Sequence, residues 1–203
     1  MALGARGFVR IGATIAGCAL VAACTPDQPP AVTPTPAPSP TATASPTPAA
    51  TSTETDIERQ MRLDWEAAEE AYRTAIAESD RLARDGGARK PTAVLEDSAT
   101  GDYLTVLVAD LRTFEARGWR LKGGVAVLNV SPSGGWSSSE LGLTACEDNS
   151  TWRVLDKKGR DVTPKNQPDY IQSLTATKSQ GVWKISDSTS RKVPNVKMSD
   201  CQS

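Results

Sequence analysis

The sequence predicts an α+β domain in which N-terminal helices pack on a curved, mostly antiparallel sheet. Apolar residues recur at helical spacing from about residue 56 to residue 117, and the spacing changes to alternation after Gly118. Turn-forming residues at 132–135, 147–150, 157–159 and 179–181 separate the strand candidates at hairpin lengths. Helices followed by strands are typical of α+β domains rather than of alternating βαβ units.

The first helix is predicted from a capping box, Thr55 with Glu58 three residues later. Gly86-Gly87 supplies its stop signal. Between these signals, apolar residues at spacings of three and four form one face of a long helix, and charged residues fill the other face. The apolar face consists of Met61, Trp65, Ala68, Tyr72, Ala75, Ile76 and Leu82.

Two shorter helices and then the strands follow. One helix is predicted to open at Pro91, and the next begins after Thr100 and ends at Gly118. Beyond Gly118, alternation predicts five strands, at 119–130, 138–146, 152–156, 170–178 and 182–188.

The bulk composition limits the domain count and the function. Nine of the 14 prolines in this chain of 203 residues fall between Pro26 and Pro48, so one folded domain is expected over 56–203. The net charge of −1 argues against a nucleic-acid partner, which needs a basic surface. The chain has no histidine, which excludes His-based acid–base catalysis, Ser-His-Asp and Cys-His systems and His-containing zinc sites. No cofactor is predicted.

Residues 1–23 have the pattern of a secretory signal peptide. Arg6 and Arg10 precede a small, apolar segment at 11–23. That segment is shorter than the ~20 residues that cross a bilayer as a helix. A short membrane anchor or a buried helix is the alternative interpretation.

The end of this segment, Leu20-Val21-Ala22-Ala23-Cys24, resembles the lipobox of bacterial lipoproteins. In that family, a diacylglyceryl group is attached to the cysteine thiol, and signal peptidase II cuts just before the cysteine. The resemblance implies that Cys24 is lipidated and becomes the first residue of the mature chain. Two acyl chains give stable attachment, so the protein is expected on the outer face of the cytoplasmic membrane.

Residues 24–55 are expected to be a disordered tether. The segment is rich in proline, threonine and alanine and has no aromatic residue, so it cannot bury enough apolar surface to fold. As polyproline II it would reach up to ~90 Å. A Pro-rich ligand for a partner domain and a glycosylated segment are the alternatives. Its composition resembles that of surface lipoproteins of high-GC Gram-positive bacteria.

The element order and several short motifs resemble the NTF2-like (cystatin-like) domains of secreted actinobacterial lipoproteins, over about residues 56–201. Such domains are cones whose open end often holds a ligand or an active site. The motifs are Trp65-x-x-Ala68-x-x-x-Tyr72, Gly118-Trp119-Arg120, Leu143-Thr144-Ala145-Cys146-x-Asp148, Gly181-Val182-Trp183-Lys184 and a C-terminal cysteine.

The lipobox resemblance accounts for two of the four cysteines. Cys18 lies in the signal segment and Cys24 is lipidated, which leaves Cys146 and Cys201. Outside the cytoplasm such a pair is most simply a disulfide. Reactive thiols and a metal pair are the alternatives, but no histidine, further cysteine or acid cluster supports them. Alternation along the strand predicts that Cys146 faces away from Leu141, Leu143 and Ala145.

Few residues are candidates for a site. Polar residues near the mouth of the predicted cone include Tyr103, Asp110 and Asp148, although Asp110 is expected to be solvated. Catalysis would need a carboxylate whose pKa is raised in an apolar pocket. Trp136 lies in a glycine-serine segment, where an exposed indole would contact a partner, a membrane or a glycan. The alternative is that Trp136 folds back over the sheet edge.

These observations lead to one functional hypothesis and two alternatives. The first is a non-enzymatic, lipid-anchored surface protein whose domain acts as a binding or scaffolding module at the boundary of membrane and cell wall, with a cell-wall or membrane protein as partner. The second is a carrier or sensor that holds a small apolar ligand in the cone. The third is an enzyme that uses a carboxylate at the cone mouth.

Overall fold

The computed structural model describes residues 54–165, 167–194 and 196–197. The predicted signal peptide, the lipobox with Cys24, nearly all of the tether and Cys201 lie outside these residues and stay predictions. Among the described residues, no helix is both long and apolar enough to cross a lipid bilayer.

The first helix, α1 (Asp56–Asp85), begins and ends at the predicted signals. The hydroxyl oxygen of Thr55 accepts a hydrogen bond from the Glu58 amide, and the Glu58 carboxylate accepts one from the Thr55 amide, so the capping box is complete. Gly86 ends the helix in the left-handed conformation (φ 105°). At Gly87, a Cβ would lie 2.2 Å from the Leu111 carbonyl oxygen, so the glycine pair also lets the backbone of the third helix approach closely.

The two shorter helices are α2 (Ala93–Ser98) and α3 (Gly101–Arg117). The hydroxyl oxygen of Thr92 caps α2 by accepting a hydrogen bond from the Leu95 amide. Gly118 ends α3 with a positive φ of 62°. The limits of α1 and α3 agree with the predicted signals, whereas α2 begins at Ala93 after the Thr92 cap and not at the predicted Pro91.

The strands form two antiparallel sheets. The larger sheet has the order β2-β3-β5-β6, from β2 (Ala126–Trp136), β3 (Glu140–Asp148), β5 (Asp169–Ser179) and β6 (Val182–Val193). The smaller sheet pairs β1 (Arg120–Lys122) with β4 (Arg153–Leu155). Register shifts interrupt the β2–β3 and β5–β6 pairs, and such bulges increase the bending of a sheet.

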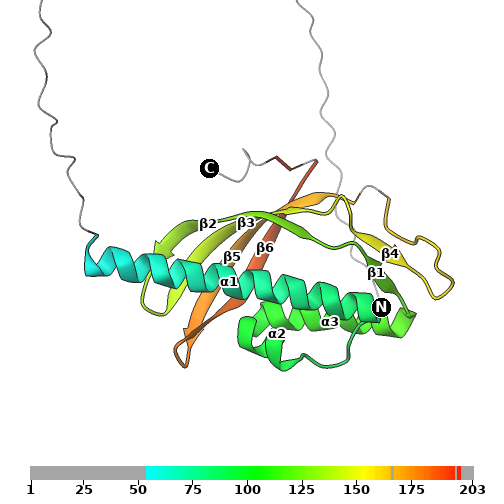
Figure 1. Ribbon diagram of the computed structural model, residues 1–203, viewed down its shortest axis with the longest axis horizontal. Coiled ribbons are helices and arrows are strands. Elements are labelled where there is room, and N and C mark those ends of the chain that lie inside the picture. The colour runs from blue at the N-terminus through cyan, green and yellow to red at the C-terminus, as the bar shows by residue number, and fades with distance from the viewer. Residues whose placement is uncertain (1–53, 166, 195, 198–203) are drawn as a thin grey trace, which may run out of the picture. The chain divides into compact units, whose positions relative to one another are not determined.

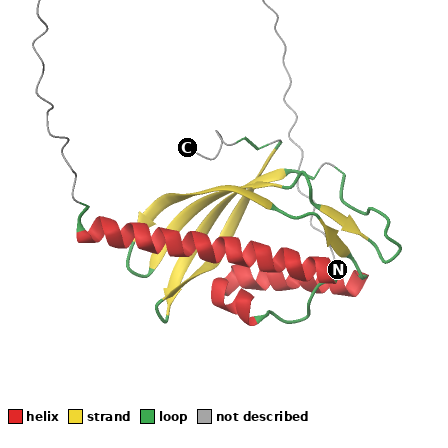
Figure 2. Ribbon diagram, in the orientation of Figure 1, coloured by secondary structure: helices red, strands yellow, loops and turns green. Residues whose placement is uncertain are grey.

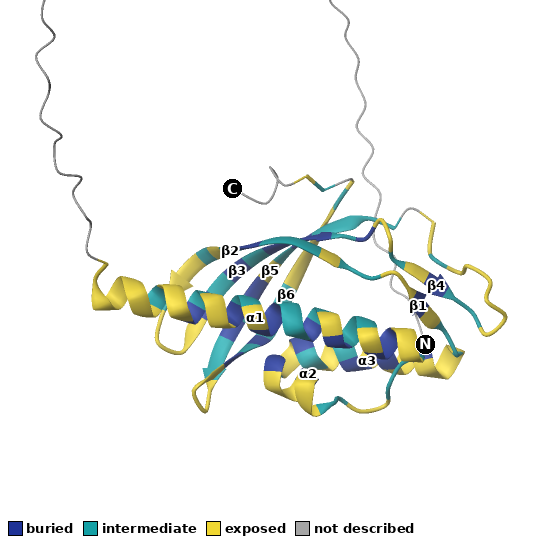
Figure 3. Ribbon diagram, viewed as in Figure 1, coloured by how far each residue is buried: buried dark blue, intermediate teal, exposed yellow. Residues whose placement is uncertain are grey.

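The helices lie along one face of the curved main sheet, with α1 crossing its strands (Figures 1 and 2). The predicted α+β class, with N-terminal helices on a curved, mostly antiparallel sheet, is confirmed. The buried residues of α1 face the strands and α3, whereas its outer face is exposed (Figure 3). The main core joins α1 to the sheet through Ala68, Tyr72, Ala75, Leu141, Leu143, Ala145, Leu174, Ala176, Trp183 and Ile185.

Two of the strand predictions are wrong in detail. The predicted strand 119–130 is divided between β1 and β2, because the backbone at Gly123 has a positive φ of 82°. The segment 132–135, predicted as a turn, belongs to β2, and the chain reverses after Trp136 instead. There the Ser137 amide donates to the Glu140 carbonyl and the Ser137 hydroxyl oxygen accepts from the Glu140 amide, so serine closes the turn.

Candidate functional site

A cleft of about 490 Å³ opens between the helices and the main sheet. We call it the α1–α3 cleft. Its walls come from α1, α3, both sheets and the loops that join them. Acidic and aromatic side chains are prominent in its lining. Three lining residues are acids, Asp80, Asp110 and Glu147, and five are aromatic, Tyr103, Phe114, Trp119, Trp152 and Tyr170.

Glu147 is the acid buried most deeply in the α1–α3 cleft, with 5% of its surface exposed. One carboxylate oxygen accepts a hydrogen bond from the Tyr72 hydroxyl, and the other accepts one from Gln172 Nε2 at 2.9 Å. The Ser190 hydroxyl in turn donates to Gln172 Oε1 at 2.6 Å. Burial raises the pKa of Glu147, and the two hydrogen bonds offset part of that effect.

The position of Glu147 follows from strand alternation. Leu141, Leu143 and Ala145 of β3 belong to the main core, whereas Cys146 packs with Ile171 on the other face of the sheet. Extending the same alternation by two residues places Glu147 on the core face. Glu147 was predicted to begin the turn at 147–150, but β3 continues to Asp148, so the central acid of the cleft was not among the predicted site residues.

The hydroxyl group of Tyr103 reaches the α1–α3 cleft without a hydrogen bond. Tyr103 lines the cleft and is 7% exposed, and among the described residues no partner binds its hydroxyl. Its ring lies 6.5 Å from that of Tyr72, centroid to centroid. Burial, and secondarily the charge of Glu147, raises the pKa of Tyr103, so the phenol keeps its proton and can both donate and accept.

Asp80 is the second acid of the cleft interior. Its Oδ2 accepts a hydrogen bond of 2.9 Å from the Val125 amide, which ties α1 to the loop between β1 and β2. Burial raises the pKa of Asp80, and the charge of Glu147 acts in the same direction. The Val125 amide and the charge of Arg84 oppose this rise. Asp80 and Glu147 therefore interact electrostatically across the cleft.

The structure separates the three polar residues predicted at the mouth. Tyr103 and Asp110 both line the α1–α3 cleft. Asp110 is solvent-exposed at its rim, as expected, yet partial burial raises the pKa of its carboxyl group. Asp148 does not line the cleft: its Oδ1 accepts a 2.7 Å hydrogen bond from the Ser150 amide, and hydrogen bonding to Ser150 lowers its pKa. Asp148 therefore closes a turn.

Trp136, the candidate partner contact, lies at the end of β2 rather than in a turn. Its side chain is half-buried against the main core, and its Nε1 donates to Asp64 Oδ2 at 3.1 Å. This is the alternative expectation, in which the indole folds back over the sheet. The hydrogen bond to α1 explains the position, because it satisfies the indole N–H.

Asp64 joins α1 to three strands of the main sheet. It is 3% exposed and accepts hydrogen bonds from Trp136, Trp183 (2.8 Å), Lys178 (3.1 Å) and Gln60 (3.1 Å). Burial alone would raise the pKa of Asp64, but these hydrogen bonds outweigh it and lower the pKa. With four donors, Asp64 has a structural role that the sequence analysis did not predict.

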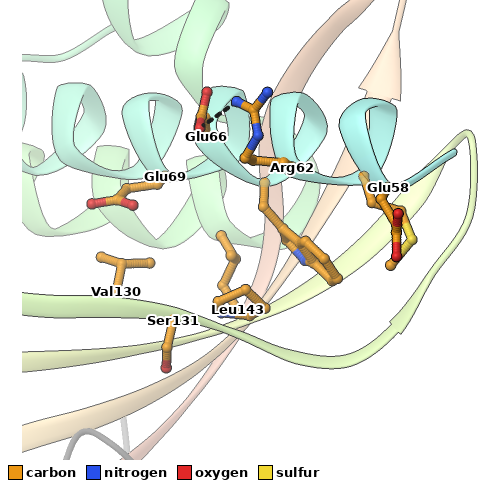
Figure 4. A pocket seen from close by; sticks show the side chains of 10 residues that line it. Glu58, Arg62, Glu66, Glu69, Val130, Ser131 and Leu143 are labelled. Carbon is orange, nitrogen blue, oxygen red and sulfur yellow. Dashed lines mark hydrogen bonds and ion pairs between the residues drawn. The ribbon is translucent and has the colours of Figure 1, made fainter. Parts of the chain in front are cut away.

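A second hollow, of about 390 Å³, lies between the first half of α1 and strands β2 and β3 (Figure 4). Val130 and Leu143 form its floor, while Arg62, ion-paired with Glu66, borders it from the helix. The indole N–H of Trp65 is buried without a hydrogen-bond partner among the described residues. Five of the ten residues that line this hollow are apolar, and the other five are charged or polar, namely Glu58, Arg62, Glu66, Glu69 and Ser131.

No group of three or more Cys, Asp or Glu side chains within the described ranges could hold a metal ion. Cys146 is fully buried on the sheet face away from the helices, where alternation places it. Cys201 lies outside the described residues, so the Cys146–Cys201 disulfide stays a prediction.

Comparisons with known proteins show no family. No protein-family model matches the sequence. No curated protein matches it. Fourteen chains of solved structures are similar to it, and three of them have 12–14% sequence identity.

The first similar structure is the intermembrane space region of the chloroplast protein ARC6, with a TM-score of 0.44 and 14% identity over 64% of this chain and 97% of that one. An uncharacterised protein with a cystatin-like fold from Caulobacter vibrioides has a TM-score of 0.33 and 12% identity, over 67% of this chain and 92% of that one. A Xanthomonas campestris protein assigned as a calcium/calmodulin-dependent protein kinase II association domain has a TM-score of 0.30 and 12% identity, over 73% and 95%. Similarities at these TM-scores carry no argument about function.

Proposed function

We propose that this chain is a lipid-anchored, non-enzymatic binding protein that holds a small molecule in the α1–α3 cleft. Of the alternatives drawn from the sequence, the carrier or sensor receives the most support. The observation that carries the proposal is the open cleft of about 490 Å³ between helices and sheet, with polar groups converging on an otherwise apolar lining.

The size and lining of the cleft support a small-molecule ligand. Pockets for such ligands measure about 300–1,000 Å³ and combine apolar walls with a few polar groups that orient the ligand. In the α1–α3 cleft, Leu107, Leu111 and Phe114 supply apolar wall, while Glu147 and Tyr103 supply polar groups. A core that only had to stabilise the fold would fill this volume with side chains.

The binding of small molecules is tested by blocking the cleft. Ser188 lines the cleft from β6, whereas its neighbour Thr189 is exposed and, by alternation, faces the opposite side. A fragment library is screened by NMR against the full chain carrying Cys24→Ser, with Ser188→Trp as the blocked variant and Thr189→Trp as the control. We expect fragments to shift cleft resonances in the parent and in Thr189→Trp but not in Ser188→Trp. Fragments that leave the cleft resonances unchanged, or that bind equally to Ser188→Trp, would contradict the proposal.

The anchoring half of the proposal rests on the sequence. The lipobox resemblance at 20–24 and the proline-rich segment that follows support a domain tethered to the outer face of the cytoplasmic membrane. Membrane fractionation of cells that express Cys24→Ala tests it. We expect the variant to remain unprocessed and to lose acylation. Full membrane attachment of a normally processed variant would refute the anchor.

One observation favours a second function, acid–base catalysis. Glu147 is a buried carboxyl group with a raised pKa, and it shares the cleft with the protonated phenol of Tyr103. A buried carboxyl group with a raised pKa, beside a phenol that can donate a proton, is the arrangement that general acid–base catalysis uses. Mass spectrometry of a bound fragment distinguishes the two functions: a binding protein returns its ligand unchanged, whereas an enzyme returns a product.

A further inference from the structure

We infer that the ligand of the α1–α3 cleft carries a positive charge on an apolar, ring-containing body, an inference that rests on the function proposed above. An organic ammonium or guanidinium group is the chemistry that fits. Three independent features of the cleft lead to it: its charge, its aromatic wall and the hydroxyl group of Tyr103.

The charge of the α1–α3 cleft is negative and uncompensated within it. Asp80, Asp110 and Glu147 line the cleft, and no lysine or arginine is found among the described residues that do so. None of the ion pairs formed by described residues includes any of the three acids. Arg84 acts on Asp80 from outside the cleft, where its Nη1 donates to the Gly123 carbonyl. A cationic group bound among these acids would supply the missing charge.

The aromatic residues form a wall suited to a cation. The ring of Phe114 meets Trp119 edge-on at 6.0 Å and Trp152 at 6.5 Å, centroid to centroid. The guanidinium carbon of Arg117 already lies 4.5 Å from the centroid of Trp119. Cations bind over aromatic faces within about 6 Å, most favourably over tryptophan. The protein itself therefore uses one ring of this wall to hold a cation.

The hydroxyl group of Tyr103 is the third feature. It is a polar group on a side chain more than nine-tenths buried, it reaches the cleft, and within the described part of the chain it has no hydrogen-bond partner. Because no described residue occupies this hydroxyl, it is free to form a hydrogen bond with a ligand in the cleft. An ammonium N–H is a suitable donor to the phenol oxygen.

Other ligand classes fit the α1–α3 cleft less well. An anion such as a phosphate or a carboxylate would be repelled by three acids and would find no basic side chain among the described lining residues. An uncharged ligand would gain the apolar contacts but would leave the acidic charge uncompensated. The low dielectric of a partly closed cleft strengthens both effects.

Three probes of matched size test the sign of the charge. They are naphthalenemethylamine, which is protonated at neutral pH, the uncharged naphthalenemethanol and the anion naphthaleneacetate. Each is titrated by NMR into the full chain carrying Cys24→Ser. We expect the dissociation constant of the cation to be at least about tenfold lower than that of either other probe.

Three variants connect the effect to the cleft. Glu147→Gln removes the buried acid, Asp110→Asn removes the acid at the exposed rim, and Glu140→Gln is the control, an exposed acid at the far end of β3. We expect Glu147→Gln to weaken binding of the cation about tenfold, Asp110→Asn to weaken it less, and Glu140→Gln to leave it unchanged. If circular dichroism shows that Glu147→Gln is unfolded, the affinity of Asp110→Asn for the cation, compared with that of Glu140→Gln, tests the inference instead.

The outcomes separate this inference from the proposed function. If the uncharged or the anionic probe binds the cleft as tightly as the cation, or if the cation is insensitive to both cleft variants, the inference about charge is wrong and the binding function stands. If none of the three probes shifts a cleft resonance, the binding function fails together with the inference.

Discussion

The hydroxyl of Tyr72 on α1 donates a hydrogen bond to the carboxylate of Glu147 on β3, 75 residues further along the chain. Both side chains are buried, and the contact joins the first helix to the sheet strand that forms the back of the α1–α3 cleft. The acid that defines the candidate site is thus held by the same helix that builds the core. Stability and binding are expected to be linked through this pair.

Removing the donor is the first prediction. Tyr72→Phe leaves Glu147 with one hydrogen bond instead of two, and a buried acceptor that loses its partner costs about 1–3 kcal/mol. We expect the free energy of unfolding to fall by that amount in urea denaturation. Tyr170→Phe is the control, since Tyr170 is half-buried and its hydroxyl binds no described residue. Equal losses of unfolding free energy in the two variants would show that the hydrogen bond from Tyr72 to Glu147 does not stabilise the fold.

The second prediction concerns the pH dependence of stability. The folded-state pKa of Glu147 is raised above its ordinary value of 4.5. Between these two values the folded chain keeps a proton that the unfolded chain has lost, so rising pH lowers the free energy of unfolding. Glu147→Gln removes the titrating carboxyl group and therefore its contribution to the pH dependence of the unfolding free energy.

The pH effect is measured by urea denaturation of Glu147→Gln and wild type at pH 4 and pH 7. We expect the free energy of unfolding of the variant minus that of wild type to be more positive at pH 7 than at pH 4. Glu140→Gln replaces an exposed acid on the same strand, serves as the control and should show the same difference at both pH values. A pH-independent difference for Glu147→Gln would contradict the prediction.

The third prediction concerns Asp64, whose pKa is shifted in the opposite direction. Asp64→Asn removes the charge that faces Lys178 and replaces one acceptor oxygen with an NH2 group, which is a donor and faces the donors of the strands, so we expect a loss of about 3 kcal/mol at neutral pH. Because the pKa is lowered, the contribution of the carboxylate is present above the ordinary value of 3.8 and is lost as the pH falls below it. The difference from wild type should therefore shrink in acid.

Denaturation curves at several pH values test the Asp64 prediction. Glu66→Gln on the same helix is the matched control, because its ion pair with Arg62 is exposed and should contribute at most about 1 kcal/mol. A loss for Asp64→Asn no larger than that of Glu66→Gln would refute the structural role of Asp64.

The fourth prediction is the disulfide expected between Cys146 and Cys201. Cys201→Ser should lower the free energy of unfolding by about 4 kcal/mol under oxidising conditions, because the bridge restricts a long loop of the unfolded chain. Reductant should destabilise the wild type and leave the variant unchanged. Mass spectrometry with thiol alkylation reports the redox state directly, and alkylation of both Cys146 and Cys201 in oxidised wild type would rule the bridge out.

The helix boundaries could be predicted because their causes are local. The capping box of Thr55 and Glu58 and the left-handed glycines Gly86 and Gly118 act within one helical turn. The change from helical spacing to alternation after Gly118 was enough to predict helices on an antiparallel sheet. Each of these signals is complete in a few neighbouring residues.

The sequence by itself determined the α+β class, the limits of α1 and α3, and the face of β3 on which Cys146 lies. Only the tertiary structure decided that Glu147 rather than Asp148 enters the cleft, that Trp136 binds Asp64, and that the Val125 amide is held by Asp80. The contact between Val125 and Asp80 joins residues 45 positions apart, and the contact between Trp136 and Asp64 joins residues 72 positions apart. The polar atoms that satisfy a buried group come from distant strands, so no local pattern specifies them.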